Sequence, residues 1–184
     1  MLLNATRSCL LIVDVQERLA PAINDGEAVI SSIAWLAAIA EQLDIPVHAT
    51  EQYPKGLGPT VSPLQCYLAS DCLHQKMHFS WMQTDASHTV KNTYPQWVVT
   101  GTEAHVCVQQ TVLEACALDH TVFVVDEAVG SRRALDKQRA LERMRRAGAH
   151  IVTREMVAFE WLRRADTDTF RAIQPLLRDG PEAL

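Results

Sequence analysis

Short apolar runs alternate along this chain with segments that repeat apolar residues at helical spacing. The runs cover residues 8–13, 47–50, 97–100, 121–125 and 150–153. Between them, residues 28–43, 106–118 and 136–147 carry apolar side chains every three or four positions, which is typical of a helix with one buried face. Runs this short and this apolar indicate strands that are covered on both faces. The alternation therefore predicts an α/β fold, a parallel sheet with helices on both sides.

The residues that follow the predicted strands give a first view of a site. Asp14 and Glu51 follow the first two runs, the turn 102–107 follows the third, and Asp126 follows the fourth. In open parallel sheets, ligands bind beyond the carboxyl ends of the strands, where loops and helix N-termini converge. We therefore expect these positions to face one edge of the sheet. Segment 51–63 is rich in proline and glycine, so it is irregular and a candidate binding loop.

Composition and charge narrow the class of protein. The chain has 184 residues, 48% of them hydrophobic and 21% charged, and no linker or repeat divides it. We expect one domain over residues 1–184. The net charge of −5 favours neither nucleic acid nor an anionic membrane, so neither is predicted as a partner.

The cysteine pattern and the N-terminus indicate a compartment. An odd number of cysteines, five, without repeated spacing does not resemble a disulfide framework. The N-terminal residues lack the basic segment and cleavage site of a signal peptide. A reducing, cytoplasmic location is expected.

Cys107 lies where the third predicted strand gives way to a helix, in the stretch GTEAHVCVQQT. Near a helix N-terminus, unpaired N–H groups favour a thiolate and can stabilise an oxyanion. The position alone favours the simpler interpretation, in which the cysteine is a small buried residue.

Asp14 and Lys76 are the other candidates for catalysis. An aspartate directly after a buried run must be paired or reach a polar cleft, and near a cysteine it can act as the base. Its alternative is a structural cap, and the sequence alone does not separate the two. Lys76 lies among histidines and aromatic residues, but lysines are mostly solvated surface charges.

Metals and cofactors have no clear motif. His74 and His78 would share a helix face, but their segment shows no helical pattern and no third ligand. No glycine-rich phosphate loop is found. We predict neither a metal nor a cofactor. The most basic stretch is expected to be a solvated helix face or a subunit contact. It comprises Arg132, Arg133, Lys137, Arg139, Arg143, Arg145 and Arg146.

Taken together, LLIVDVQERL, TEQYPKGLGPT, QKMHFS and GTEAHVCVQQT give the chain a clear resemblance. It resembles the isochorismatase-like cysteine hydrolases, which include the nicotinamidases, and looks most like the isochorismatase-domain-containing proteins. The resemblance implies a three-layer α/β/α fold with a sheet of about six strands. It also implies a homo-oligomer.

The resemblance assigns roles to site residues. Asp14 is the base, Lys76 its electrostatic partner and Cys107 the nucleophile. A cis peptide bond between Thr102 and Glu103 is implied, with the backbone N–H groups of Glu103 and Cys107 forming the oxyanion hole.

Two departures limit the transfer of function. Nicotinamidases bind a metal through an aspartate and histidines after the second strand, where this chain has EQYPK without a histidine. Isochorismatases proper cleave a vinyl ether and lack the cysteine in the site. Neither reaction is therefore predicted.

The sequence predicts a cysteine-dependent hydrolase that acts on a small amide or related acyl compound through a thioester. Gln16, Tyr53 and Trp81 lie beside the site motifs and are candidates for the pocket wall, with packing as their alternative. Two other functions stay open. One is a non-catalytic protein that binds a small ligand on the same fold, and the other is thiol redox chemistry through a second cysteine.

Overall fold

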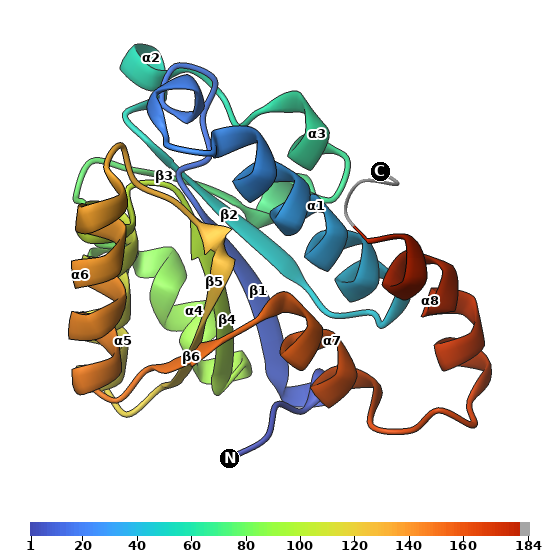
Figure 1. The fold of residues 1–184 in the computed structure, drawn as a ribbon. Coiled ribbons are helices and arrows are strands. Elements are labelled where there is room, and N and C mark those ends of the chain that lie inside the picture. The colour runs from blue at the N-terminus through green and yellow to red at the C-terminus, as the bar shows by residue number, and fades with distance from the viewer. Residues whose placement is uncertain (181–184) are drawn as a thin grey trace.

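A sheet of six parallel strands in the order β3-β2-β1-β4-β5-β6 forms the centre of the computed structural model (Figure 1). The strands are β1 (Ser8–Val13), β2 (Val47–Gln52), β3 (Leu73–Lys76), β4 (Gln96–Gly101), β5 (Thr121–Val129) and β6 (His150–Val152). The structure describes residues 1–180, so the last four residues of the predicted domain 1–184 lie outside the described part.

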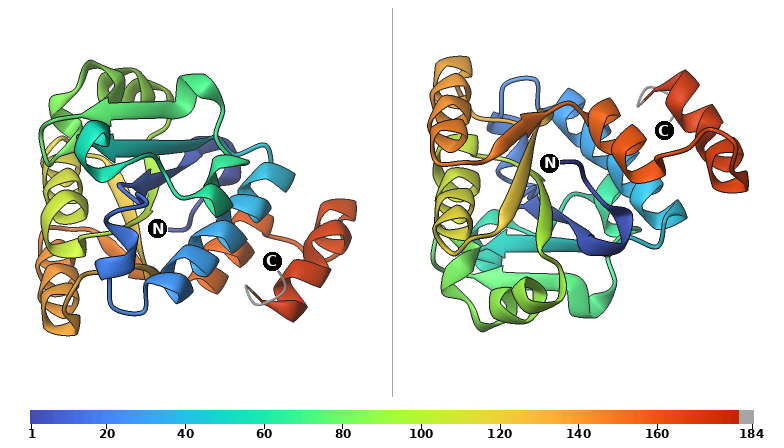
Figure 2. Two further views of the ribbon diagram at one scale, coloured as in Figure 1. Left: turned by 90° about the horizontal axis from the view of Figure 1, so that it is seen from above. Right: turned by 90° about the horizontal axis from the view of Figure 1, so that it is seen from below.

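Helices cover both faces of this sheet (Figure 2). One face carries α1 (Gly26–Gln42), α3 (Ser62–Gln65), α7 (Arg154–Leu162) and α8 (Asp168–Asp179); the other carries α4 (Asp85–Thr93), α5 (Gln109–Ala117) and α6 (Ala134–Arg146). The shorter elements are α2 (Pro54–Leu57), the 3-10 turns η1 (Ala5–Arg7), η2 (Ala20–Ala22), η3 (Ser70–Cys72) and η4 (Trp81–Gln83), and the π-helical turn η5 (Ala104–Val108). None of the helices within residues 1–180 is long and apolar enough to cross a membrane.

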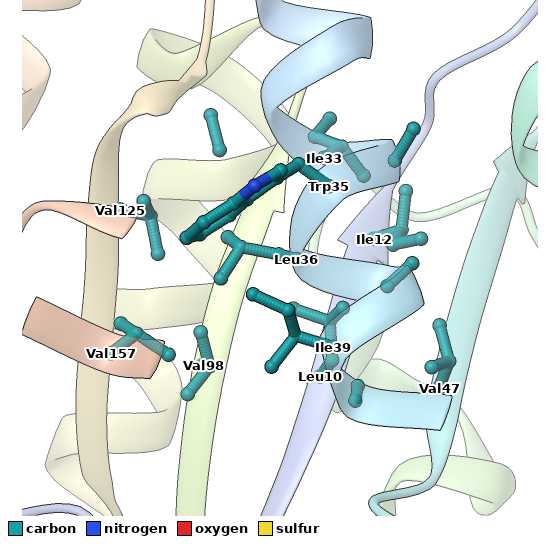
Figure 3. Close-up of a cluster of buried hydrophobic side chains, with 14 of the residues drawn as sticks. Leu10, Ile12, Ile33, Trp35, Leu36, Ile39, Val47, Val98, Val125 and Val157 are labelled. Carbon is teal, nitrogen blue, oxygen red and sulfur yellow. The ribbon is translucent and has the colours of Figure 1, made fainter. Parts of the chain in front are cut away.

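Side chains of the central strands enter two cores. On β1, Leu10 and Ile12 pack under α1, as Figure 3 shows, whereas Leu11 and Val13 face α5 and α6. Successive side chains of a strand point to opposite faces, so a strand with two cores must be apolar throughout. This is why Ser8–Val13 is buried at every position. The predicted fold class is confirmed.

Most predicted elements are found, and the differences have local causes. The helix predicted at 28–43 is α1, and the strand predicted at 121–125 continues to Val129, so Asp126 lies within β5 and not after it. The strand β3 was not predicted. Its residues LHQK are mostly polar, because it lies at the edge of the sheet and exposes two of its four side chains.

The carboxyl ends of β1 and β4 approach closely at Gly101. A Cβ atom at this glycine would lie 2.2 Å from the carbonyl oxygen of Val13, and its φ of +136° is one that other residues rarely adopt. Next to this contact, β1 leads into Asp14 and β4 into the turn that carries Cys107. Since the strand order reverses between β1 and β4, this is where a ligand crevice is expected.

Candidate active site

Asp14 lies directly after β1 with a φ of +54° and no exposed surface. Its Oδ1 accepts a hydrogen bond from Thr50 Oγ1 at 2.7 Å, and its Oδ2 lies 2.6 Å from Lys76 Nζ. Its backbone carbonyl accepts a hydrogen bond from Thr102 Oγ1 at 2.6 Å. A buried carboxylate of this kind is tolerated because it is paired with a charge and hydrogen-bonded.

Lys76 is the last residue of β3, and its side chain reaches Asp14, which follows β1, past the intervening strand β2. Its ammonium group donates to Asp14, to Gln52 Oε1 at 2.9 Å and to the carbonyl of Phe79 at 3.0 Å. These three contacts use all three donors of the ammonium group. The surface interpretation of Lys76 is therefore wrong, since its side chain has no exposed surface.

Cys107 lies within η5, and it is 4% exposed. Its thiol lies beside the Asp14–Lys76 pair, close enough for both charges to act on it. Burial raises the pKa of the Cys107 thiol well above its usual range, the Asp14 carboxylate raises it further, and Lys76 lowers it. Burial therefore acts against the thiolate that a helix terminus would favour.

The turn before Cys107 is made differently from the prediction. The peptide bond between Thr102 and Glu103 is trans, as are the other peptide bonds of the described residues, so the predicted cis peptide is wrong. The chain turns because Glu103 adopts the left-handed region at φ +54°. The backbone N–H of Glu103 donates to no acceptor within residues 1–180.

A cavity of about 570 Å³ opens beside Cys107. Its lining comprises Leu19, Ala22, Gln52, Leu57, Phe79, Glu103, Val106, Cys107 and Arg132. Most of these side chains are apolar, and they come from the end of β2 and from the segments that follow β1, β2, β3, β4 and β5. Among the described residues, no cluster of three or more His, Cys, Asp or Glu could hold a metal ion.

None of the three predicted pocket residues lines this cavity. Gln16 is fully buried and its amide group binds the backbone of the loop after β2: it donates to the carbonyls of Gln52 and Gly58 and accepts from the N–H of Gln52. Trp81 is also fully buried, with its ring 5.2 Å from that of Trp97. Tyr53 is 47% exposed outside the cavity.

Arg132 is a site residue that the sequence analysis placed elsewhere. The sequence predicts it on a solvated helix face or in a subunit contact, but α6 begins only at Ala134, and Arg132 pairs with Glu103 at the rim of the cavity. Asp126, predicted at the same edge, instead pairs with Lys137 at 3.1 Å. The signal for Arg132 was its place in the loop after β5, at the carboxyl edge of the sheet.

Comparison with known proteins identifies the family of this chain. The sequence profile of the Isochorismatase domain matches residues 8–156, so the chain belongs to the isochorismatase family. An isochorismatase domain-containing protein 2 of Danio rerio is 36% identical over 177 residues, which cover 95% of this chain and 89% of the relative.

Solved structures share the fold. That of the MAR1 ribonuclease from Caenorhabditis elegans has a TM-score of 0.92 at 34% identity and covers 97% of this chain and 93% of that one. YcaC from Pseudomonas aeruginosa, solved with hexane-2,5-diol and covalent acrylamide, has a TM-score of 0.84 at 25% identity, with 97% and 96% of the two chains covered. The family and its fold support a hydrolase.

Proposed function

We propose that this protein is a cysteine hydrolase of small amides or related acyl compounds. The observation that supports this most strongly is the position of the Cys107 thiol, which lies beside the buried Asp14–Lys76 pair and opens into a largely apolar cavity. A nucleophile, a base beside it and a cation paired with that base are the parts that acyl transfer to cysteine needs.

In the first half of the reaction, Asp14 removes the thiol proton as the sulfur of Cys107 attacks the carbonyl carbon. The new C–S bond pushes the carbonyl electrons onto oxygen, and the N–H groups of Glu103 and Cys107 stabilise that oxyanion. Lys76 stabilises the transient thiolate. When the oxyanion collapses, the C–N bond breaks and the leaving amine takes the proton from Asp14, which leaves a thioester.

In the second half, Asp14 removes a proton from water while the water oxygen attacks the thioester carbonyl. The C–S bond then breaks, the carboxylic acid departs, and the sulfur regains a proton from Asp14. Asp14 thus serves as base and then as acid in each half, and the site returns to its starting state.

Two observations support the electrophile and the oxyanion. The backbone N–H of Glu103 has no acceptor among the described residues. A developing oxyanion would be that acceptor. Acrylamide is a small primary amide and an electrophile, and it is bound covalently in the structure of the Pseudomonas aeruginosa relative.

Ribonuclease activity, which the name of the Caenorhabditis elegans relative states for that protein, has less support here. A site for RNA needs cations for the phosphates. The cavity beside Cys107 has one arginine at its rim, and that arginine is paired with Glu103. The net charge of −5 acts in the same direction.

The experiment that tests this proposal is ammonia release from a panel of small primary amides by the wild-type protein and by Cys107→Ala. We expect hydrolysis by the wild type and a loss of at least about 10³-fold in the variant, because the nucleophile is gone. Activity that survives in Cys107→Ala would refute the nucleophile. A panel that binds without turnover would favour the non-catalytic ligand-binding protein. The homo-oligomer and the cytoplasmic location stay predictions.

A further inference from the structure

The carboxylate of Glu103 lies under the rim of the cavity and is almost closed off from solvent. Its side chain is 8% exposed. Arg132 donates two hydrogen bonds to this carboxylate: Nε lies 3.0 Å from Oε1, and Nη2 lies 3.3 Å from Oε2. His105 Nε2 is 3.5 Å from the same Oε2. Two-pronged contacts of this kind are the strongest that an arginine makes with a carboxylate.

Among the described residues that line the cavity, Arg132 is the one with a basic side chain, and Glu103 is paired with it. A ligand carboxylate that approached Arg132 would compete with Glu103 for the guanidinium group. If the ligand won, the nearly buried Glu103 carboxylate would lose its cation and keep only the His105 contact, which is unfavourable, although the 60% exposure of the Arg132 side chain reduces the cost. The pair therefore opposes binding of an anion even though it contains an arginine.

The other polar side chains of the lining are also occupied. Gln52 accepts from Lys76 Nζ at 2.9 Å and donates to the carbonyl of Met77 at 2.9 Å, so both ends of its amide are used. Lys76 itself neutralises Asp14. The charges of Asp14 and Lys76 offset each other, and so do those of Glu103 and Arg132.

The remaining wall is apolar. It comprises Leu19, Ala22, Leu57, Phe79 and Val106. Such a wall gains free energy from an aliphatic group and gives no hydrogen bonds to an ammonium or carboxylate group that must leave water.

We infer that the Glu103–Arg132 ion pair sets the charge selectivity of the site, so that the cavity accepts small amides with an uncharged acyl group. This inference rests on the proposed function and names its substrate class. Glu103 and Arg132 act here as specificity residues through their charges, while the backbone of Glu103 contributes to catalysis.

Three primary amides of equal length test this selectivity: butyramide, succinamate and 3-aminopropanamide, which end in a methyl, a carboxylate and an ammonium group. For the wild-type protein we expect kcat/KM for butyramide to exceed both others by at least about 30-fold. Wild-type turnover of succinamate at a rate equal to that of butyramide would overturn the inference.

Variants that neutralise one charge of the pair at a time give the sharper result. Glu103→Gln releases Arg132, so succinamate should gain at least about tenfold relative to butyramide. Arg132→Gln leaves Glu103 without its fork and should favour 3-aminopropanamide instead. The double variant should return to a preference for butyramide. Arg133→Gln, next in the chain and outside the cavity lining, is the matched control and should keep the wild-type order. An unchanged order in both single variants would overturn the inference.

A second measurement is independent of turnover, so failure of the proposed function and failure of this inference can be told apart. Iodoacetamide is neutral and iodoacetate is its anionic counterpart, and peptide mass spectrometry can follow the alkylation of each cysteine. At Cys107, the ratio of the two rates should exceed the ratio at the exposed Cys66 by at least about tenfold, and Glu103→Gln should lower it. Equal ratios at the two cysteines would overturn the selectivity, whether or not any amide is hydrolysed.

Discussion

The ammonium nitrogen of Lys76 lies 2.6 Å from Oδ2 of Asp14, and neither side chain has exposed surface. Lys76 is the last residue of β3 and Asp14 directly follows β1, with β2 between the two strands. The sheet itself therefore brings the two charges together. Each charge is tolerated in the interior only because of the other. The stability of the fold and the position of the proposed base therefore depend on the same contact.

Lys76→Met tests this dependence. Removal of one partner from a buried ion pair leaves an uncompensated charge, so the free energy of unfolding should fall by about 3 to 5 kcal/mol in urea denaturation. The matched control is Lys137→Met, because its pair with Asp126 is partly exposed to solvent, with 29% and 50% of the two side chains exposed, and should contribute less than about 1 kcal/mol. The double variant Asp14→Asn/Lys76→Met should recover much of the lost stability. Equal losses of unfolding free energy in Lys76→Met and Lys137→Met would show that the buried pair is no more important than the partly exposed one.

The Gln16 side chain should hold the loop that carries Leu57. Of its three hydrogen bonds to the backbone of Gln52 and Gly58, one is buried and two are partly buried, and Gln16→Leu leaves these backbone groups unpaired. We expect a loss of about 2 to 4 kcal/mol in the free energy of unfolding and a higher KM for butyramide. Gln65→Leu removes one bond from the exposed side of the same loop and should change both much less. A KM unchanged in Gln16→Leu would mean that the loop does not shape the cavity.

The pair of His48 and His74 should make the fold sensitive to acid. Their Nδ1 and Nε2 atoms are 3.2 Å apart, and burial together with His74 lowers the pKa of His48 to about 4. A depressed histidine pKa contributes stability above about pH 6.5, and this contribution is lost as the pH falls toward 4. Between these pH values the wild type should lose about 2 kcal/mol more than His48→Gln. Parallel pH profiles of the two proteins would contradict the low pKa.

Buried thiols should weaken the fold at alkaline pH. Burial raises the pKa of the Cys9 thiol well above its usual range, and Cys72 raises it further. A raised thiol pKa contributes stability below the pKa of the unfolded chain, about 8.5, and this stability is lost as the pH rises above that value. Cys9→Ala should therefore show a shallower decline between about pH 8.5 and 10.5 than the wild type. The outcome that counts against this is an identical slope in both proteins.

The sequence allowed the sheet to be predicted because its central strands are covered on both faces. Full coverage requires an uninterrupted apolar run, as in Ser8–Val13, and such runs stand out in the chain. The edge strand β3 has no such requirement, and its polar residues LHQK gave no signal. Lys76 was therefore placed by resemblance alone, although it ends that strand.

The places of Asp14 and Cys107 were predictable from the sequence, whereas the shape of the cavity was not. Asp14 follows a buried run and Cys107 follows a strand, so topology alone brings both to one edge. The cavity wall depends on side chains from several loops, and the conformation of loops depends on long-range contacts such as those of Gln16. Glu103 shows the same limit, because its left-handed backbone is visible only in the folded turn.

A thioester on Cys107 is the central claim, and acid-quenched mass spectrometry tests it most directly. The protein is mixed with butyramide, quenched within one turnover and digested, and each cysteine peptide is examined for an added butyryl group. We expect this group on the Cys107 peptide alone, and its accumulation in any variant that slows attack by water. Hydrolysis of butyramide with no acyl group on Cys107, or an acyl group on Cys107→Ala at another residue, would contradict it.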